Sequence, residues 1–125
     1  VSTQERIAKA RIWRKRYGAG MRQIGILAAA GHYASDNNIE LLARDHGNAK
    51  KLAEACGLPA PDTNIVAIDV SDYPFNASEY AATLKANGIL AGALGPNFVR
   101  LVTHMDLTDE DIHTACEILK RTLVA

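Results

Sequence analysis

The chain has 125 residues, of which 48% are hydrophobic, and its 14 basic residues equal its 14 acidic residues in number. A chain of this length buries roughly two-thirds of its unfolded surface, which suits one compact domain and not two. No run of about 18 uncharged apolar residues occurs in it, and this excludes a membrane-spanning helix. The two cysteines, Cys56 and Cys116, match no metal or redox spacing, so we expect reduced, mostly buried thiols and a cytoplasmic location.

A net charge of zero conceals a strong asymmetry along the chain. Seven of the 14 basic residues lie at or before Arg22, where Glu5 is the only acid. The first 22 residues therefore carry about +6 and the remainder about −6. A basic segment of this kind favours an anionic partner, whether a phosphate, a carboxylate or a nucleic-acid backbone.

The first half of the chain predicts three helices. Ser2 or Thr3 caps the first, whose apolar residues recur every three or four positions until the Gly-Ala-Gly of residues 18–20 ends it. The second, about Met21–Ala34, is apolar nearly all round, so we expect it to be buried. The third, about Ile39–Cys56, is amphipathic and stops at a glycine.

The second half alternates strands and helices. A β-branched, alternating segment, Asn64–Val70, predicts a strand, and Ala77–Ala86 predicts a helix with Asn76 or Ser78 as its cap. Two further strands are expected at Ile89–Ala93 and Phe98–His104, and the acids of Thr108–Asp111 open a last helix. The order β-α-β-β-α predicts a small α+β layer of helices on a sheet.

Between these halves the chain carries one glycine and two prolines within residues 57–62. Because proline removes a backbone donor and clashes with the preceding turn, no helix continues through this segment. We therefore predict a domain boundary between residues 1–56 and residues 57–125.

Arg100 is the sharpest single candidate for a binding residue. It sits in the middle of an apolar strand, where a permanent charge contributes little to packing. Its planar guanidinium suits a carboxylate, which it binds through two parallel hydrogen bonds. By pattern alone the commoner case is structural: an arginine on an edge strand that points to water, or one paired with an internal aspartate.

A second candidate is the turn Gly18-x-Gly20 before a helix. Its backbone N–H groups are able to bind a phosphate, with Lys15 and Arg22 adding positive charge, although a plain helix–helix turn is the commoner meaning of two glycines. The four histidines are dispersed and have no zinc-ligand spacing, so no metal site is predicted. No serine or cysteine nucleophile has a plausible base, and the chain alone makes no complete active site.

Three blocks of the sequence resemble the C-terminal portion of the low-specificity L-threonine aldolases. They follow one another in the family's order: Trp13-Arg14-Lys15 with residues 18–31, then Leu42–Ala49, then Val99–Asp106. The first block is the most specific, because Met21-Arg22-Gln23 follows the glycine turn and leads into a run of small residues.

This resemblance implies an enzyme that depends on pyridoxal phosphate (PLP) and has the aspartate-aminotransferase fold, fold type I, which is α/β overall. Residues 1–56 would be the helical end of its PLP-binding large domain, and residues 57–125 its small α+β domain. Such enzymes cleave L-threonine or L-allo-threonine, and other β-hydroxy-α-amino acids, to glycine and an aldehyde. The Schiff-base lysine is expected before Val1, so we expect no catalytic residue in this chain and no activity without the N-terminal part.

The resemblance also assigns roles to three residues of this chain. Arg100 matches the arginine that holds the substrate α-carboxylate. Arg22 and Lys15 match positions near the cofactor phosphate and the subunit boundary. The family usually has glycine where Ala19 stands, so a positive φ at that position would strain the turn.

By the same resemblance, the partners are an amino-acid substrate, the N-terminal part of the enzyme and further copies of it in a tetramer built as a dimer of dimers. Neither nucleic acid nor a membrane is expected. Two alternatives stay open: a related PLP-dependent β-eliminating lyase or racemase, and a stand-alone α+β module that binds an anion or nucleic acid through its basic end.

Overall fold

The computed structural model describes residues 2–123, and the chain divides into two compact units, one up to Ile39 and one from Glu40 onward. The first unit contains α1 (Gln4–Arg16) and α2 (Gly25–Asn37), and neither helix has a buried residue. The expectation of one compact domain is therefore wrong. The reason is that the composition contains enough apolar residues for one core, but those of the first unit have no element packed over them.

Helix α1 begins and ends much as its sequence predicts. Thr3 caps it by accepting a hydrogen bond from the backbone N–H of Arg6 at 3.4 Å, and an ion pair of 2.7 Å joins Glu5 to Lys9 one turn later. The helix ends at Arg16, two residues before Gly18, whose φ is +78°, and no described residue other than glycine has a positive φ. Ala19 is therefore not strained, because Gly18 adopts the left-handed conformation that the turn needs.

Helix α2 differs from its prediction in position and in burial. It begins at Gly25, after a turn that occupies the first residues of the predicted range, and it ends at Asn37. Ile24 precedes it without a side-chain cap. The expected burial of this helix is wrong for the described chain, because an apolar helix surface is buried only where another element covers it.

The second unit is built on a three-stranded antiparallel sheet with the order β1-β3-β2. Its strands are β1 (Ile65–Asp69), β2 (Gly92–Leu94) and β3 (Phe98–Val102). The predicted order β-α-β-β-α is confirmed. Strand β2 starts later than expected because the chain first completes the end of the preceding helix, where Gly88 has a φ of +92° and Ile89 donates to the Leu84 carbonyl at 2.9 Å.

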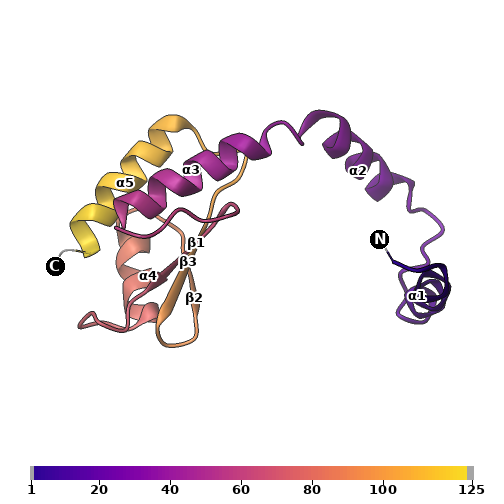
Figure 1. Cartoon of the computed structure of the whole chain (residues 1–125), viewed down its shortest axis with the longest axis horizontal. Helices are drawn as coiled ribbons and strands as arrows, with labels where there is room; N and C mark the ends of the chain where they lie inside the picture. Colours follow the sequence, from indigo (N-terminus) through magenta and orange to yellow (C-terminus); the bar gives the residue numbers. More distant parts are fainter. Residues whose placement is uncertain (1, 124–125) are drawn as a thin grey trace. The chain divides into compact units, whose positions relative to one another are not determined.

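Three helices cover one face of this sheet: α3 (Leu42–Ala55), α4 (Ala77–Ala86) and α5 (Asp109–Leu123) (Figure 1). Between helices and sheet lies a core of 14 buried apolar residues among those described, to which every element of the second unit except β2 contributes. Local signals start two of the helices. Asn76 and Glu79 form a capping box on α4, and Thr108 exchanges hydrogen bonds with Asp111 at the start of α5.

Helix α3 belongs to the second unit, so the contact boundary lies before this helix, whereas the sequence prediction placed a boundary after it. Its apolar face packs on α5 and β1, and the buried Thr103 hydroxyl donates to the Asp45 carbonyl at 2.6 Å. The assignment of residues 1–56 to the large domain of an enzyme stays a prediction. No helix within residues 2–123 is long and apolar enough to cross a membrane.

Candidate functional site

One face of the sheet carries the candidate site. Burial alternates along β1 and β3, so that Val66, Ile68, Val99 and Leu101 point into the core and their neighbours do not. We call the other side the open sheet face; its residues come from all three strands and are mostly apolar: Ile65, Ala67, Asp69, Gly92, Leu94, Phe98, Arg100 and Val102. No element within residues 40–123 covers this face, and a bare apolar surface of this kind marks a contact or ligand site.

Arg100 stands at the centre of the open sheet face. It lies on the middle strand β3, directly opposite Ala67 on β1 and Gly92 on β2. The neighbours on both sides are therefore among the smallest residues, which leaves the arginine side chain bare along its flanks. The edge-strand alternative is excluded, because β3 is hydrogen-bonded on both sides.

Arg100 has no ion-pair partner in the described part of the chain. The four ion pairs of residues 2–123 join Lys9 to Glu5, Lys51 to Asp109, His104 to Asp106 and Lys120 to Glu117. The second structural alternative, pairing with an internal aspartate, is therefore absent from the structure. A guanidinium without a partner on an apolar surface is suited to bind a carboxylate or phosphate from outside the unit.

Lys15 and Arg22 belong to the first unit and flank the turn after α1. The Lys15 ammonium donates to the carbonyl of Gly20 at 3.4 Å. A Cβ built at Gly20 would lie 2.5 Å from Cδ of Lys15, so glycine makes room for this side chain. Arg22 is exposed, and no ion pair of the described residues includes it. Two cations beside one turn fit a phosphate group by charge.

The cysteines and histidines supply no second site. Burial raises the pKa of Cys56 to about 11 and raises that of Cys116 as well, so both thiols are protonated at neutral pH. Both thiols are free, and both are partly buried where the sequence predicted mostly buried ones. Within residues 2–123 no three His, Cys, Asp or Glu side chains gather in a metal-binding group. Nδ1 of His104 lies 3.5 Å from Oδ2 of Asp106, but no third side chain of these types in residues 2–123 completes a group with them.

Sequence reasoning found Arg100 but missed the small residues beside it. Ala67 lies 33 positions before Arg100, and the strand register alone makes them neighbours. A pattern of alternating burial in β1 signals that Ala67 faces away from the core. No signal in the sequence identifies which residue of β3 stands opposite.

The sequence of this chain matches a known protein family. The family model described as beta-eliminating lyase matches residues 1–72, more than half of the chain. The chain belongs to the beta-eliminating lyase family. Proteins of this family are PLP-dependent lyases. The matched residues end before Arg100, so the role of that residue stays a prediction.

Most of the similar curated proteins are named as low-specificity L-threonine aldolases. The relative from Escherichia coli strain K12 is 40% identical over 117 residues, which is 90% of this chain and 34% of the relative. Low-specificity L-threonine aldolase 1 from Arabidopsis thaliana is 33% identical over 133 residues, 99% of this chain and 37% of the relative. The resemblance predicted from the sequence blocks is confirmed, and the chain spans about a third of the length of these relatives.

Proposed function

We propose that this chain is the C-terminal part of a PLP-dependent L-threonine aldolase of fold type I. The enzyme cleaves L-threonine, L-allo-threonine and similar β-hydroxy-α-amino acids to glycine and an aldehyde. The observation that carries the proposal is the unpaired Arg100 at the centre of the open sheet face. The names of two similar proteins, both low-specificity L-threonine aldolases, support the reaction.

In this proposal Arg100 binds the α-carboxylate of the substrate. The planar guanidinium forms two parallel hydrogen bonds to the two carboxylate oxygens, which fixes the plane of that group. Position and direction of the arginine are set by β3, which is held on both sides by hydrogen bonds to β1 and β2. Fixing the carboxylate limits rotation of the amino acid, and the Cα–Cβ bond is thereby held in one orientation for cleavage.

The apolar residues around Arg100 strengthen this contact. Phe98 and Val102 flank it on β3, and Leu94 lies on β2 next to Phe98. Where such side chains exclude water, the attraction between guanidinium and carboxylate is screened less than at an open surface. Bound PLP supplies an electron sink for the electron pair that bond cleavage leaves on the substrate.

Lys15 and Arg22 are proposed to hold the cofactor phosphate and to lie near a subunit boundary. Their ammonium and guanidinium groups offset the charge of a phosphate dianion, and this chain offers them on one turn. The lysine that binds PLP covalently is proposed to lie outside these 125 residues. The assembly is proposed to be a cytoplasmic tetramer, a dimer of dimers, with no nucleic-acid partner.

The test is Arg100→Ala in the complete enzyme. Loss of the arginine that binds the carboxylate is expected to raise KM strongly. It is also expected to lower kcat/KM by a factor that corresponds to a loss of about 2–4 kcal/mol of transition-state binding. Arg100→Lys keeps the charge but not the planar fork, so its defect is expected to be intermediate. Arg121→Ala is the matched control, because Arg121 is also exposed and donates to Asn87 on the helical side of the unit. An unchanged kcat/KM for threonine in Arg100→Ala would contradict the proposal.

Product analysis separates the aldolase from its alternatives. Related PLP enzymes that eliminate a β-substituent or racemise the amino acid share the carboxylate contact, and the family description itself is that of a β-eliminating lyase. Glycine and acetaldehyde from L-threonine support the aldolase. Ammonia with a 2-oxo acid would assign the chain to an eliminating lyase instead, and D-allo-threonine, the product of inversion at Cα alone, would assign it to a racemase.

A further inference from the structure

One acidic residue shares the open sheet face with Arg100. Asp69 ends β1 opposite Phe98, two positions along β3 from Arg100, and it points to the same side of the sheet. Diagonal neighbours on one face of an antiparallel pair lie about 7–8 Å apart, which is within reach of a long side chain. The chain therefore contains an internal carboxylate able to compete with a substrate for Arg100.

The structure shows that this carboxylate is engaged elsewhere. Oδ1 of Asp69 accepts a hydrogen bond of 2.9 Å from the backbone N–H of Ser71 and one of 2.5 Å from the Ser71 hydroxyl. The hydroxyl bond is the larger of two causes that hold the pKa of Asp69 below its usual value, the backbone bond being the other. Among the described residues no ion pair joins Asp69 to Arg100.

Both bonds turn the carboxylate toward the segment that leaves the strand. An aspartate that accepts from the residue two positions on forms an Asx turn, a local structure that directs the chain out of a strand. The backbone N–H of Val70 donates to the Asn97 carbonyl at 2.8 Å, so the start of this turn is fixed against the β2–β3 connection. Asp69 is thus oriented by contacts that do not involve Arg100.

We propose that Ser71 is a positioning residue that holds Asp69 away from Arg100 and so keeps Arg100 open to the substrate carboxylate. This inference rests on the proposed function, because it concerns the availability of the same arginine. If Asp69 were paired with Arg100 for part of the time, the apparent affinity for an amino acid would fall by the fraction of paired molecules.

The experiment compares Ser71→Ala, Ser71→Thr and Ser71→Ala/Asp69→Asn in the complete enzyme. In Ser71→Ala the hydroxyl bond is lost while the backbone bond remains, so KM for L-threonine is expected to rise about two- to fivefold, the range of an exposed ion pair, at unchanged kcat. Ser71→Thr retains the hydroxyl and is expected to keep the original KM. Adding Asp69→Asn removes the competing charge and is expected to restore KM.

A crystal structure of the Ser71→Ala enzyme without substrate gives a second readout. It is expected to show the Asp69 carboxylate at the Arg100 guanidinium in at least one conformer. An unchanged KM in Ser71→Ala, or a raised KM that Asp69→Asn does not restore, would overturn the role of Ser71 while Arg100→Ala still supports the carboxylate site. An unchanged KM in Arg100→Ala would overturn the proposed function itself.

Discussion

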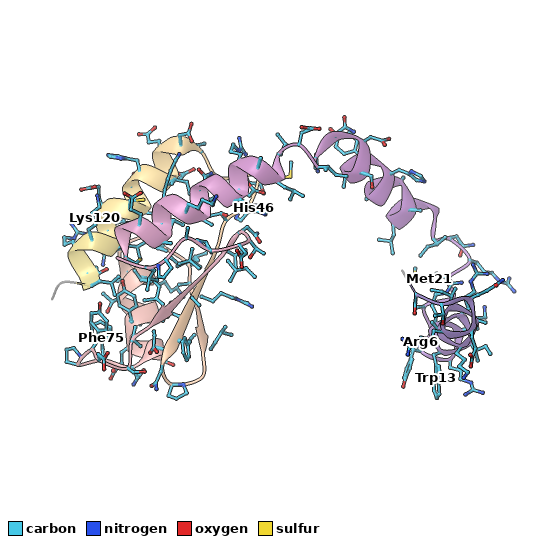
Figure 2. The ribbon with its side chains drawn as sticks, viewed as in Figure 1. Arg6, Trp13, Met21, His46, Phe75 and Lys120 are labelled. Atoms are coloured by element: carbon cyan, nitrogen blue, oxygen red, sulfur yellow. The ribbon has the colours of Figure 1, made fainter. Side chains whose placement is uncertain are left out.

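The two units of this chain contain helices of nearly equal length in opposite environments. Helix α2 has 13 residues, an apolar composition and no buried residue, whereas α3 has 14 residues, five of which are buried. In the first unit the side chains of α1, among them Arg6 and Trp13, stand out from the helix and none is buried (Figure 2). Helix formation is a local property of sequence, while burial depends on what else is folded against the helix.

The same contrast appears in the apolar side chains. Ile26 of α2 is 81% exposed, while Leu84 of α4 is fully enclosed in the core of the second unit. By composition α2 would be the better candidate for a core helix. The buried apolar core of the described chain therefore lies in the second unit, and the first unit adds exposed apolar surface.

The largest expected effect that tests this contrast is in the core. Leu84→Ala is expected to lower the free energy of unfolding by about 2–5 kcal/mol, because it removes a fully buried side chain and leaves a cavity. Chemical denaturation followed by circular dichroism measures it. The control is Leu90→Ala in the same unit, at a site 82% exposed, where a change of less than about 0.5 kcal/mol is expected. Equal losses from both would mean that the core is assigned wrongly.

Removing one helix cap in each unit is expected to have a smaller effect on stability, and it compares the two units directly. Oδ1 of Asn76 accepts hydrogen bonds from the backbone N–H groups of Ser78 and Glu79 at 2.9 and 3.0 Å. Asn76→Ala therefore removes the capping box of α4. We expect this substitution to lower the free energy of unfolding by about 1 kcal/mol.

Thr3→Ala is the matched change in the first unit, where Thr3 caps α1. It is expected to reduce the helical signal slightly and to leave the unfolding free energy unchanged, because α1 buries no side chain. A loss of cooperative stability from Thr3→Ala would show that α1 folds together with the second unit.

The smallest expected effect is a pH dependence at the start of α5. The hydroxyl of Thr108, followed by its backbone N–H, holds the pKa of Asp111 below its usual value of 3.8. Because the folded pKa is the lower one, this contribution to stability is complete above pH 3.8 and is lost as the pH falls through the folded pKa.

Unfolding followed from pH 6 to pH 2 measures this dependence. Asp111→Asn is expected to weaken the loss of stability in acid, and Asp72→Asn, at an exposed acid outside any helix, serves as the control. Identical acid profiles for Asp111→Asn and the unmodified chain would contradict the assigned cap.

Local chemistry explains why so much of the second unit was predictable. The alternation of Asn64–Val70 fixed a strand, and the Asn76 and Thr108 caps fixed where α4 and α5 begin, since each signal acts over three or four residues. The short strand β2 was placed too early, because Gly88 and Ile89 are engaged in ending α4, a competition that the strand pattern does not reveal.

The sequence by itself determined the helices and strands, the β-α-β-β-α order, the family and the candidate Arg100. All of these follow from near neighbours along the chain or from the three sequence blocks that resemble the aldolases. Only the tertiary structure decided that Arg100 lies on the central strand between Ala67 and Gly92, that Ser71 engages Asp69, and that α2 is bare. Register and burial join residues tens of positions apart, and the free energy that sets them comes from packing between elements rather than from any one segment.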